Sequence, residues 1–111
     1  MPTDVRGRGI DAVICEAIER RRLLSFDYEG EMRLVQPAVL GLHRTTDRLS
    51  LRAFQVGGVS RSGGPAGWRL YTVRKLRDPR IRDEPFAAPP PGYRPDDDEL
   101  WPIVCRLHTD H

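Results

Sequence analysis

The stretch that decides the fold is Trp68-Arg69-Leu70-Tyr71-Thr72-Val73-Arg74-Lys75-Leu76. Basic, aromatic and aliphatic side chains alternate along it, which is the pattern of a half-buried strand. The apolar side chains of such a strand can close a small barrel, while Arg69, Arg74 and Lys75 can present cations to a phosphate. The stretch therefore predicts a small β domain that binds an anionic ligand, with nucleic acid as the first candidate.

The segments around this stretch predict one helix followed by short strands. Apolar residues recur at helical spacing across 10–22, and the period then changes to two. Gly30 supplies the positive φ of a tight hairpin turn. We expect strands at 24–28, 33–37, 39–42, 49–54, 68–75 and 80–82. This order predicts a mainly β (α+β) fold, in which a strongly bent antiparallel sheet closes on itself and the N-terminal helix covers one end.

Residues 55–67 contain five glycines, which forbid a regular element there. Two interpretations stay open for this segment. It can be a flexible hairpin loop, or its backbone N–H groups can wrap a phosphate with the help of Arg61. It is not a Walker motif, because no Lys-Ser/Thr pair and no helix follow it.

Composition and charge describe an ordinary water-soluble domain with an uneven charge distribution. The 111 residues are 31% charged and 39% hydrophobic, and no apolar run is long enough to cross a membrane or to form the core of a signal peptide. We therefore expect a cytoplasmic protein. Residues 1–82 carry a net charge of +7 and residues 83–111 carry −5. The basic part can meet a polyanion, or the acidic tail can fold back and neutralise it. The preference for Arg over Lys suits phosphate binding, although a GC-rich genome produces the same bias.

Neither the cysteines nor the histidines predict a metal or redox site. Cys15 and Cys105 lie far apart, and a disulfide is not expected in a cytoplasmic chain. No Cys/His spacing resembles a zinc site, so we expect no metal and no cofactor. The acidic run 96–99 can bind a divalent cation or form a solvated turn.

The C-terminal part differs from the rest. Residues 87–95 are rich in proline and are expected to be extended and free of helix. Residues 100–107 return to strand-like composition, and Trp101 and Ile103 are expected to anchor this tail on the barrel or on a neighbouring subunit. We therefore divide the chain into an N-terminal extension at 1–9, a barrel domain at 10–86 and an acidic tail at 87–111.

A series of short motifs resembles the WYL domain, a bacterial module with an SH3-like, Sm-like β-barrel. The resemblance covers roughly 10–86 and is carried by the helix 12–18, by Phe26-Asp27-Tyr28, by Arg33-Leu34-Val35-Gln36-Pro37 with Leu40-Gly41, by 49–54 and by 69–76. Leu49 and Ser50 replace the Trp and Tyr of the signature. Thr72 replaces a basic residue and Arg74 an acidic one. Since only nine residues precede the first helix, we expect a stand-alone domain without a DNA-reading helix-turn-helix.

The resemblance implies a ligand-sensing role in transcription or defence-system regulation, with single-stranded nucleic acid or a nucleotide as the ligand. The positions that match the family are Tyr28, Arg33, Arg69 and Lys75, and charge and placement add Arg52, Arg61 and Arg74. In this hypothesis the arginines bind phosphates and Tyr28, Phe54 or Tyr71 stacks on a base.

Two other classes of function are an interaction module and an enzyme. The alternative is a protein-interaction or oligomerisation module, accessory to a separate DNA-binding or nuclease protein, which uses the C-terminal tail to form a homodimer or to bind a partner. An enzyme is not expected, because the sequence contains no Gly-x-Ser-x-Gly and no Cys/His order that recurs in known catalytic sites.

Overall fold

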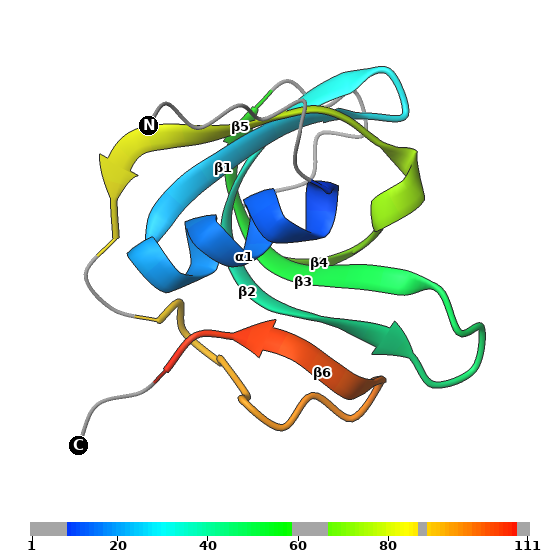
Figure 1. Cartoon of the computed structure of the whole chain (residues 1–111). Coiled ribbons are helices and arrows are strands. Elements are labelled where there is room, and N and C mark those ends of the chain that lie inside the picture. The colour runs from blue at the N-terminus through cyan, green and yellow to red at the C-terminus, as the bar shows by residue number, and fades with distance from the viewer. Residues whose placement is uncertain (1–8, 59–66, 87–88, 109–111) are drawn as a thin grey trace.

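A strongly curved antiparallel sheet forms the body of the protein, and an α-helix lies across its open side (Figure 1). The computed structural model describes residues 9–58, 67–86 and 89–108. Within these residues the helix is α1 (Ile10–Arg20), and the strands are β1 (Arg22–Tyr28), β2 (Glu31–His43), β3 (Leu49–Gly58), β4 (Gly67–Thr72), β5 (Leu76–Pro85) and β6 (Leu100–Arg106).

Helix α1 follows the predicted apolar periodicity and buries one face against the sheet. Its buried side chains are Val13, Ile14, Ala17 and Ile18. The helix stops because Arg21 adopts the left-handed conformation at φ 53°, and its N–H caps the carbonyls of the last turn. The helix is therefore two residues shorter than the predicted 10–22.

The strand order is β4-β3-β2-β1-β5, and β6 pairs with β2 outside this path. Strand β2 is long enough to pair with two strands along one edge. Its residue Val35 pairs with Leu24 of β1, and Leu40 pairs with Cys105 of β6. The predicted closure of the sheet is not seen. Among the described residues β4 and β5 are the two ends of the strand order and do not pair with each other. A short 3-10 helix, η2 (Val73–Lys75), links them.

Several predicted strand boundaries were wrong. Pro37 does not end a strand, because a register shift between Pro37 and Val39 accommodates a residue that cannot donate a ladder hydrogen bond. Strand β3 runs on to Gly58, so the first part of the glycine-rich segment is regular; residues 59–66 lie outside the described residues. The predicted strand 68–75 gives way to η2 after Thr72. The hairpin turn is confirmed, with Glu29 at φ 53° and Gly30 at φ 82°.

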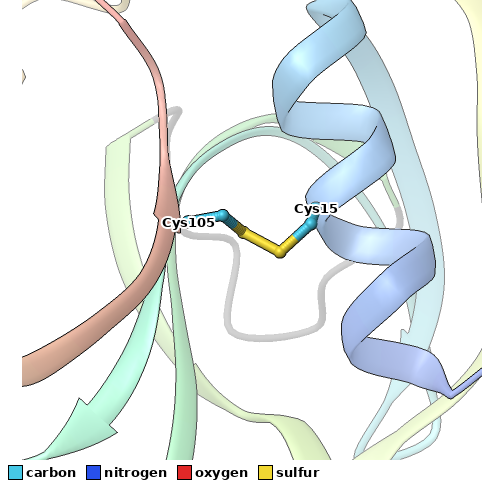
Figure 2. Close-up of a disulfide and its surroundings, with 2 residues drawn as sticks. All are labelled: Cys15 and Cys105. Carbon is cyan, nitrogen blue, oxygen red and sulfur yellow. A yellow bond between two sulfur atoms is a disulfide. The ribbon is translucent and has the colours of Figure 1, made fainter.

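A disulfide joins Cys15 on α1 to Cys105 on β6, contrary to the prediction (Figure 2). The two Cα atoms lie 5.9 Å apart. The prediction was wrong because it was argued from compartment alone, whereas pairing depends on the elements that the fold brings together. Disulfides persist mainly in oxidising compartments, and the cytoplasmic location expected above stays a prediction.

The C-terminal tail belongs to the same sheet through β6. Leu100 is fully buried and Leu107 nearly so, and these two residues anchor the tail. Trp101, which was expected to be an anchor, is 61% exposed, and Ile103 is half-buried. No helix among the described residues is long and apolar enough to span a bilayer.

Candidate functional site

Strand alternation brings several of the predicted side chains to the concave face of the sheet. Successive side chains of a strand point to opposite faces, so Arg69 shares a face with the buried Tyr71 of β4, and Arg33 shares one with the buried Val35 of β2. Contacts between these strands complete a group that we call the inner-face cluster, made of Tyr28, Arg33, Gln55, Arg69 and Tyr71.

Arg33 is a largely enclosed cation, with a side chain only 12% exposed. Its guanidinium lies over the ring of Tyr28, 5.8 Å from the centroid. Nη2 lies 3.3 Å from a carboxylate oxygen of Glu31 and 3.4 Å from the Tyr28 carbonyl, and Nη1 lies 3.5 Å from Gln55 Oε1. The buried Nε–H has no hydrogen-bond partner among the described residues. One donor of this guanidinium is therefore unsatisfied in the described structure.

Tyr71 forms the floor of the cluster. Its hydroxyl donates a 2.9 Å hydrogen bond to Gln55 Oε1, and its ring makes edge contacts with Phe26 and Tyr28 at 5.0 Å. Burial raises the pKa of Tyr71, and the nearby positive charges of Arg33 and Arg69 only partly offset this rise. The hydroxyl is therefore protonated at neutral pH.

The position of Arg69 follows from the same contacts. Its charge acts on the Tyr71 hydroxyl, as that of Arg33 does, so both guanidiniums lie within electrostatic range of this hydroxyl. The side chain is half-buried, and Nη1 donates to the Trp68 carbonyl at 3.0 Å. Glu31 is the carboxylate that contacts the Arg33 guanidinium on this face.

The chemistry of the cluster suits an anion better than an aromatic base. Guanidinium N–H groups match phosphate oxygens. Tyr28 and Tyr71 are 8% and 2% exposed, so their ring faces are not open for a base to stack on. Phe54 packs instead against Trp68 on the other face. The stacking role expected of these rings does not fit their surroundings.

The other predicted residues lie elsewhere. Arg74 and Lys75 are exposed on η2, and Lys75 forms an ion pair with Glu29 at 3.7 Å. Arg61 lies outside the described residues. Arg52 points to the convex face, where its guanidinium binds Asp97 at 2.8 Å and also Glu99. The structure thus brings together Tyr28, Arg33 and Arg69 and leaves Arg52, Arg74 and Lys75 apart from them.

Sequence reasoning missed Glu31 and Gln55. Glu31 was assigned only to the turn, and Gln55 only to an irregular segment. The signal for Gln55 lies in the alternation of 51–55. If the strand is extended by one residue beyond Phe54, Gln55 points to the same face as Ala53.

The convex face of β3 and β4 carries a second arrangement, in which the acidic tail folds back on the sheet. We call residues 89–99 the strap. Trp68 Nε1 donates a 2.8 Å hydrogen bond to the Pro91 carbonyl, and the Trp68 ring stacks on Tyr93 with centroids 6.4 Å apart. A pocket of about 370 Å³ lies between the strap and the sheet and is lined by Arg52, Trp68, Gly92, Tyr93, Arg94, Asp97, Asp98 and Glu99.

The ion pair of Arg52 with the strap is strong enough to shift both partners. Burial alone raises the pKa of Asp97, but hydrogen bonds from the Arg52 guanidinium and the Glu99 N–H outweigh it and bring the pKa below its ordinary value. Burial likewise lowers the pKa of Arg52, and the two carboxylates outweigh it and raise that pKa. Both groups are charged at neutral pH.

Comparisons of the chain with models of known protein families, with characterised proteins and with solved structures found no significant match.

Proposed function

We propose that the chain is a non-catalytic ligand-sensing domain of the WYL type, built on an SH3-like or Sm-like barrel, which binds the phosphate of a nucleotide or of single-stranded nucleic acid through the inner-face cluster. The observation that carries the proposal is that Arg33 and Arg69 both lie on the concave face, within electrostatic range of the Tyr71 hydroxyl. The helix, the strong curvature and the order of five consecutive strands agree with the fold that the resemblance implies.

The buried donor of Arg33 supports a ligand that accepts hydrogen bonds. A buried N–H without an acceptor costs on the order of 1–3 kcal/mol. A phosphate oxygen that accepted from this N–H would recover that free energy, and because the N–H is buried, neighbouring side chains must move for the oxygen to reach it. Because Tyr28 and Tyr71 are buried, affinity comes from the phosphate and the site places little demand on the base.

The proposal is tested with fluorescein-labelled, 5′-phosphorylated hexathymidylate, measured by anisotropy from 20 to 300 mM NaCl. We expect saturable binding that weakens steeply as salt rises, because phosphate contacts release counterions. Arg33→Gln and Arg69→Gln should each weaken binding about tenfold or more, since a hydrogen bond to a charged group contributes roughly 1.5–3 kcal/mol.

Matched controls separate the cluster from general basicity. Arg80→Gln removes an arginine whose side chain is 68% exposed on β5, and it should leave the affinity within about twofold of wild type. Arg33→Lys keeps the charge but loses the planar fork, so it should bind better than Arg33→Gln and worse than wild type. Equal losses in Arg80→Gln and Arg69→Gln, or no binding at 20 mM NaCl, would refute the proposal.

A further inference from the structure

The strap occupies the convex face of β3 and β4 through three chemically different contacts. The Trp68 indole N–H binds the Pro91 carbonyl, the Trp68 ring stacks on Tyr93, and Arg52 binds the carboxylates of Asp97 and Glu99. Phe54 supports the indole from the side, edge to face at 5.5 Å. We call the face formed by Arg52, Phe54 and Trp68 the convex recognition surface.

The part of the strap that contacts Trp68 is a proline-glycine turn. Tyr93 N–H donates to the Pro90 carbonyl at 3.1 Å, and Gly92 has φ 82°, as the third position of a type II turn requires. A Cβ at Gly92 would lie 3.3 Å from Trp68 Nε1. The turn fits against the indole because this residue has no side chain.

The strap does not fill the surface that it covers. Described residues 89–99 form no helix or strand, and the pocket of about 370 Å³ remains between them and the sheet. The pocket is partly open to solvent. A surface that offers an indole donor, an aromatic face and a half-buried guanidinium, and that its own cover fills only in part, has the features of a peptide-binding site.

We propose that the convex recognition surface binds a proline-glycine turn followed by an aromatic residue and carboxylates on another protein, and that the strap is an internal competitor for this site. Charge complementarity supports this occupant, because Arg52 is neutralised in the closed form by two carboxylates of the strap. The surface lies on the opposite face of β3 and β4 from the inner-face cluster, so this inference does not depend on the proposed ligand.

The strap competes at a high effective concentration because both of its ends are attached to the domain. Phe86 N–H, just before it, binds the Arg21 carbonyl, and β6, just after it, is tied to α1 by the disulfide. Tethering of this kind gives effective concentrations of about millimolar or more. A partner therefore binds well only when the strap is loosened.

The test uses the full chain and a fluorescein-labelled peptide with the sequence of residues 89–99. A loosened variant carries Tyr93→Ala, Asp97→Asn and Glu99→Gln, which remove the stack and both carboxylates but leave the surface intact. We expect the peptide to bind the loosened variant saturably and at least tenfold more tightly than wild type. Adding Arg52→Gln should reduce that affinity at least tenfold, as should replacing the acidic residues of the peptide by amides.

Several results would overturn the proposal. These are equal affinity for wild type and the loosened variant, Arg52-dependent binding of hexathymidylate in place of the peptide, and a concentration-dependent dimer of the loosened variant in sedimentation velocity, which would assign the surface to a second copy. If the triple substitution unfolds the chain, Glu99→Gln alone, at a side chain 55% exposed, provides the same test: it must raise peptide affinity above that of wild type.

Discussion

Asp97 shows how one residue couples the tail to the sheet. Its side chain is 9% exposed and lies 2.8 Å from Arg52, 45 residues earlier in the chain. The acidic run 96–99 was open to two interpretations, a cation site or a solvated turn. Asp97 and Glu99 instead bind Arg52. This contact agrees with the interpretation of the charge distribution in which the acidic tail folds back on the basic part of the chain. The partner itself was not predictable, because nothing local to either residue indicates which cation meets which carboxylate.

The lowered pKa of Asp97 makes the stability of the protein depend on pH. A carboxyl group whose pKa is lower in the folded state adds stability that is fully present above its unfolded pKa, about 3.9, and is lost as pH falls through the folded value. We expect Asp97→Asn to lower the melting temperature at pH 7 and to approach wild type as pH falls below about 4. Asp98→Asn, at a side chain 74% exposed, is the control and should change little. Parallel curves for wild type and Asp97→Asn across this range would contradict the account.

At the scale of the elements, β2 organises the sheet because it pairs with β1, β3 and β6. At Gly41 strand β2 approaches β6 closely. A Cβ there would lie 2.9 Å from the Pro102 carbonyl and 3.2 Å from the Leu100 Cβ. Since backbone atoms of β6 cannot move aside cheaply, any side chain at this position pushes the two strands apart.

Gly41→Ala should therefore destabilise the protein by roughly 1–3 kcal/mol, the usual cost of overpacking, and should loosen β6 selectively. Urea unfolding measures the first effect, and amide hydrogen exchange of 100–106 measures the second. Gly30→Ala is the matched control, because no atom lies within 4 Å of the added Cβ and only the positive φ is strained. Unchanged exchange in β6 of Gly41→Ala would show that the close approach is unimportant.

Elements with clear local periodicity were predicted well, and those that depend on distant neighbours were not. The helix at 10–22 and the hairpin at Gly30 follow from spacing and backbone preference alone. The predicted strand end at Pro37 was wrong because a register shift in the pairing of β2 with β3 accommodates the proline. On the site, the prediction grouped Arg52 with Arg69. In the structure Arg69 lies opposite Ala53, whereas Arg52 precedes Ala53 on β3 and points to the other face, which is visible only once Ala53 is known to be buried.

The whole molecule is held together across its length by the Cys15–Cys105 disulfide, whose cysteines are 90 residues apart in sequence. A cross-link that closes so long a loop restricts the unfolded chain strongly and typically contributes about 2–4 kcal/mol. It also joins the first element of the fold to the last (Figure 1). The sequence alone did not reveal it, because the pairing requires β6 to lie beside α1.

Replacing both cysteines by alanine should therefore lower the free energy of unfolding by about 2–4 kcal/mol in guanidinium titrations, with a similar loss when wild type is unfolded in excess dithiothreitol. The double alanine variant has no cysteine left, so its unfolding should not change when dithiothreitol is added, which controls for effects of the reagent. Mass spectrometry after alkylation of unreduced wild type should find no free thiol. Two alkylated cysteines, or identical midpoints with and without reductant, would contradict the pairing.

The central claim is that Arg33 and Arg69 together face a phosphate on the concave side of the sheet. The most direct measurement is a ¹H–¹⁵N titration of arginine Nε–H resonances with 5′-phosphorylated hexathymidylate. The account predicts that the Arg33 and Arg69 signals move together and saturate at one dissociation constant, while the exposed Arg80 signal stays in place. Shifts confined to exposed arginines, or none at Arg33, whose Nε–H has no acceptor among the described residues, would contradict it.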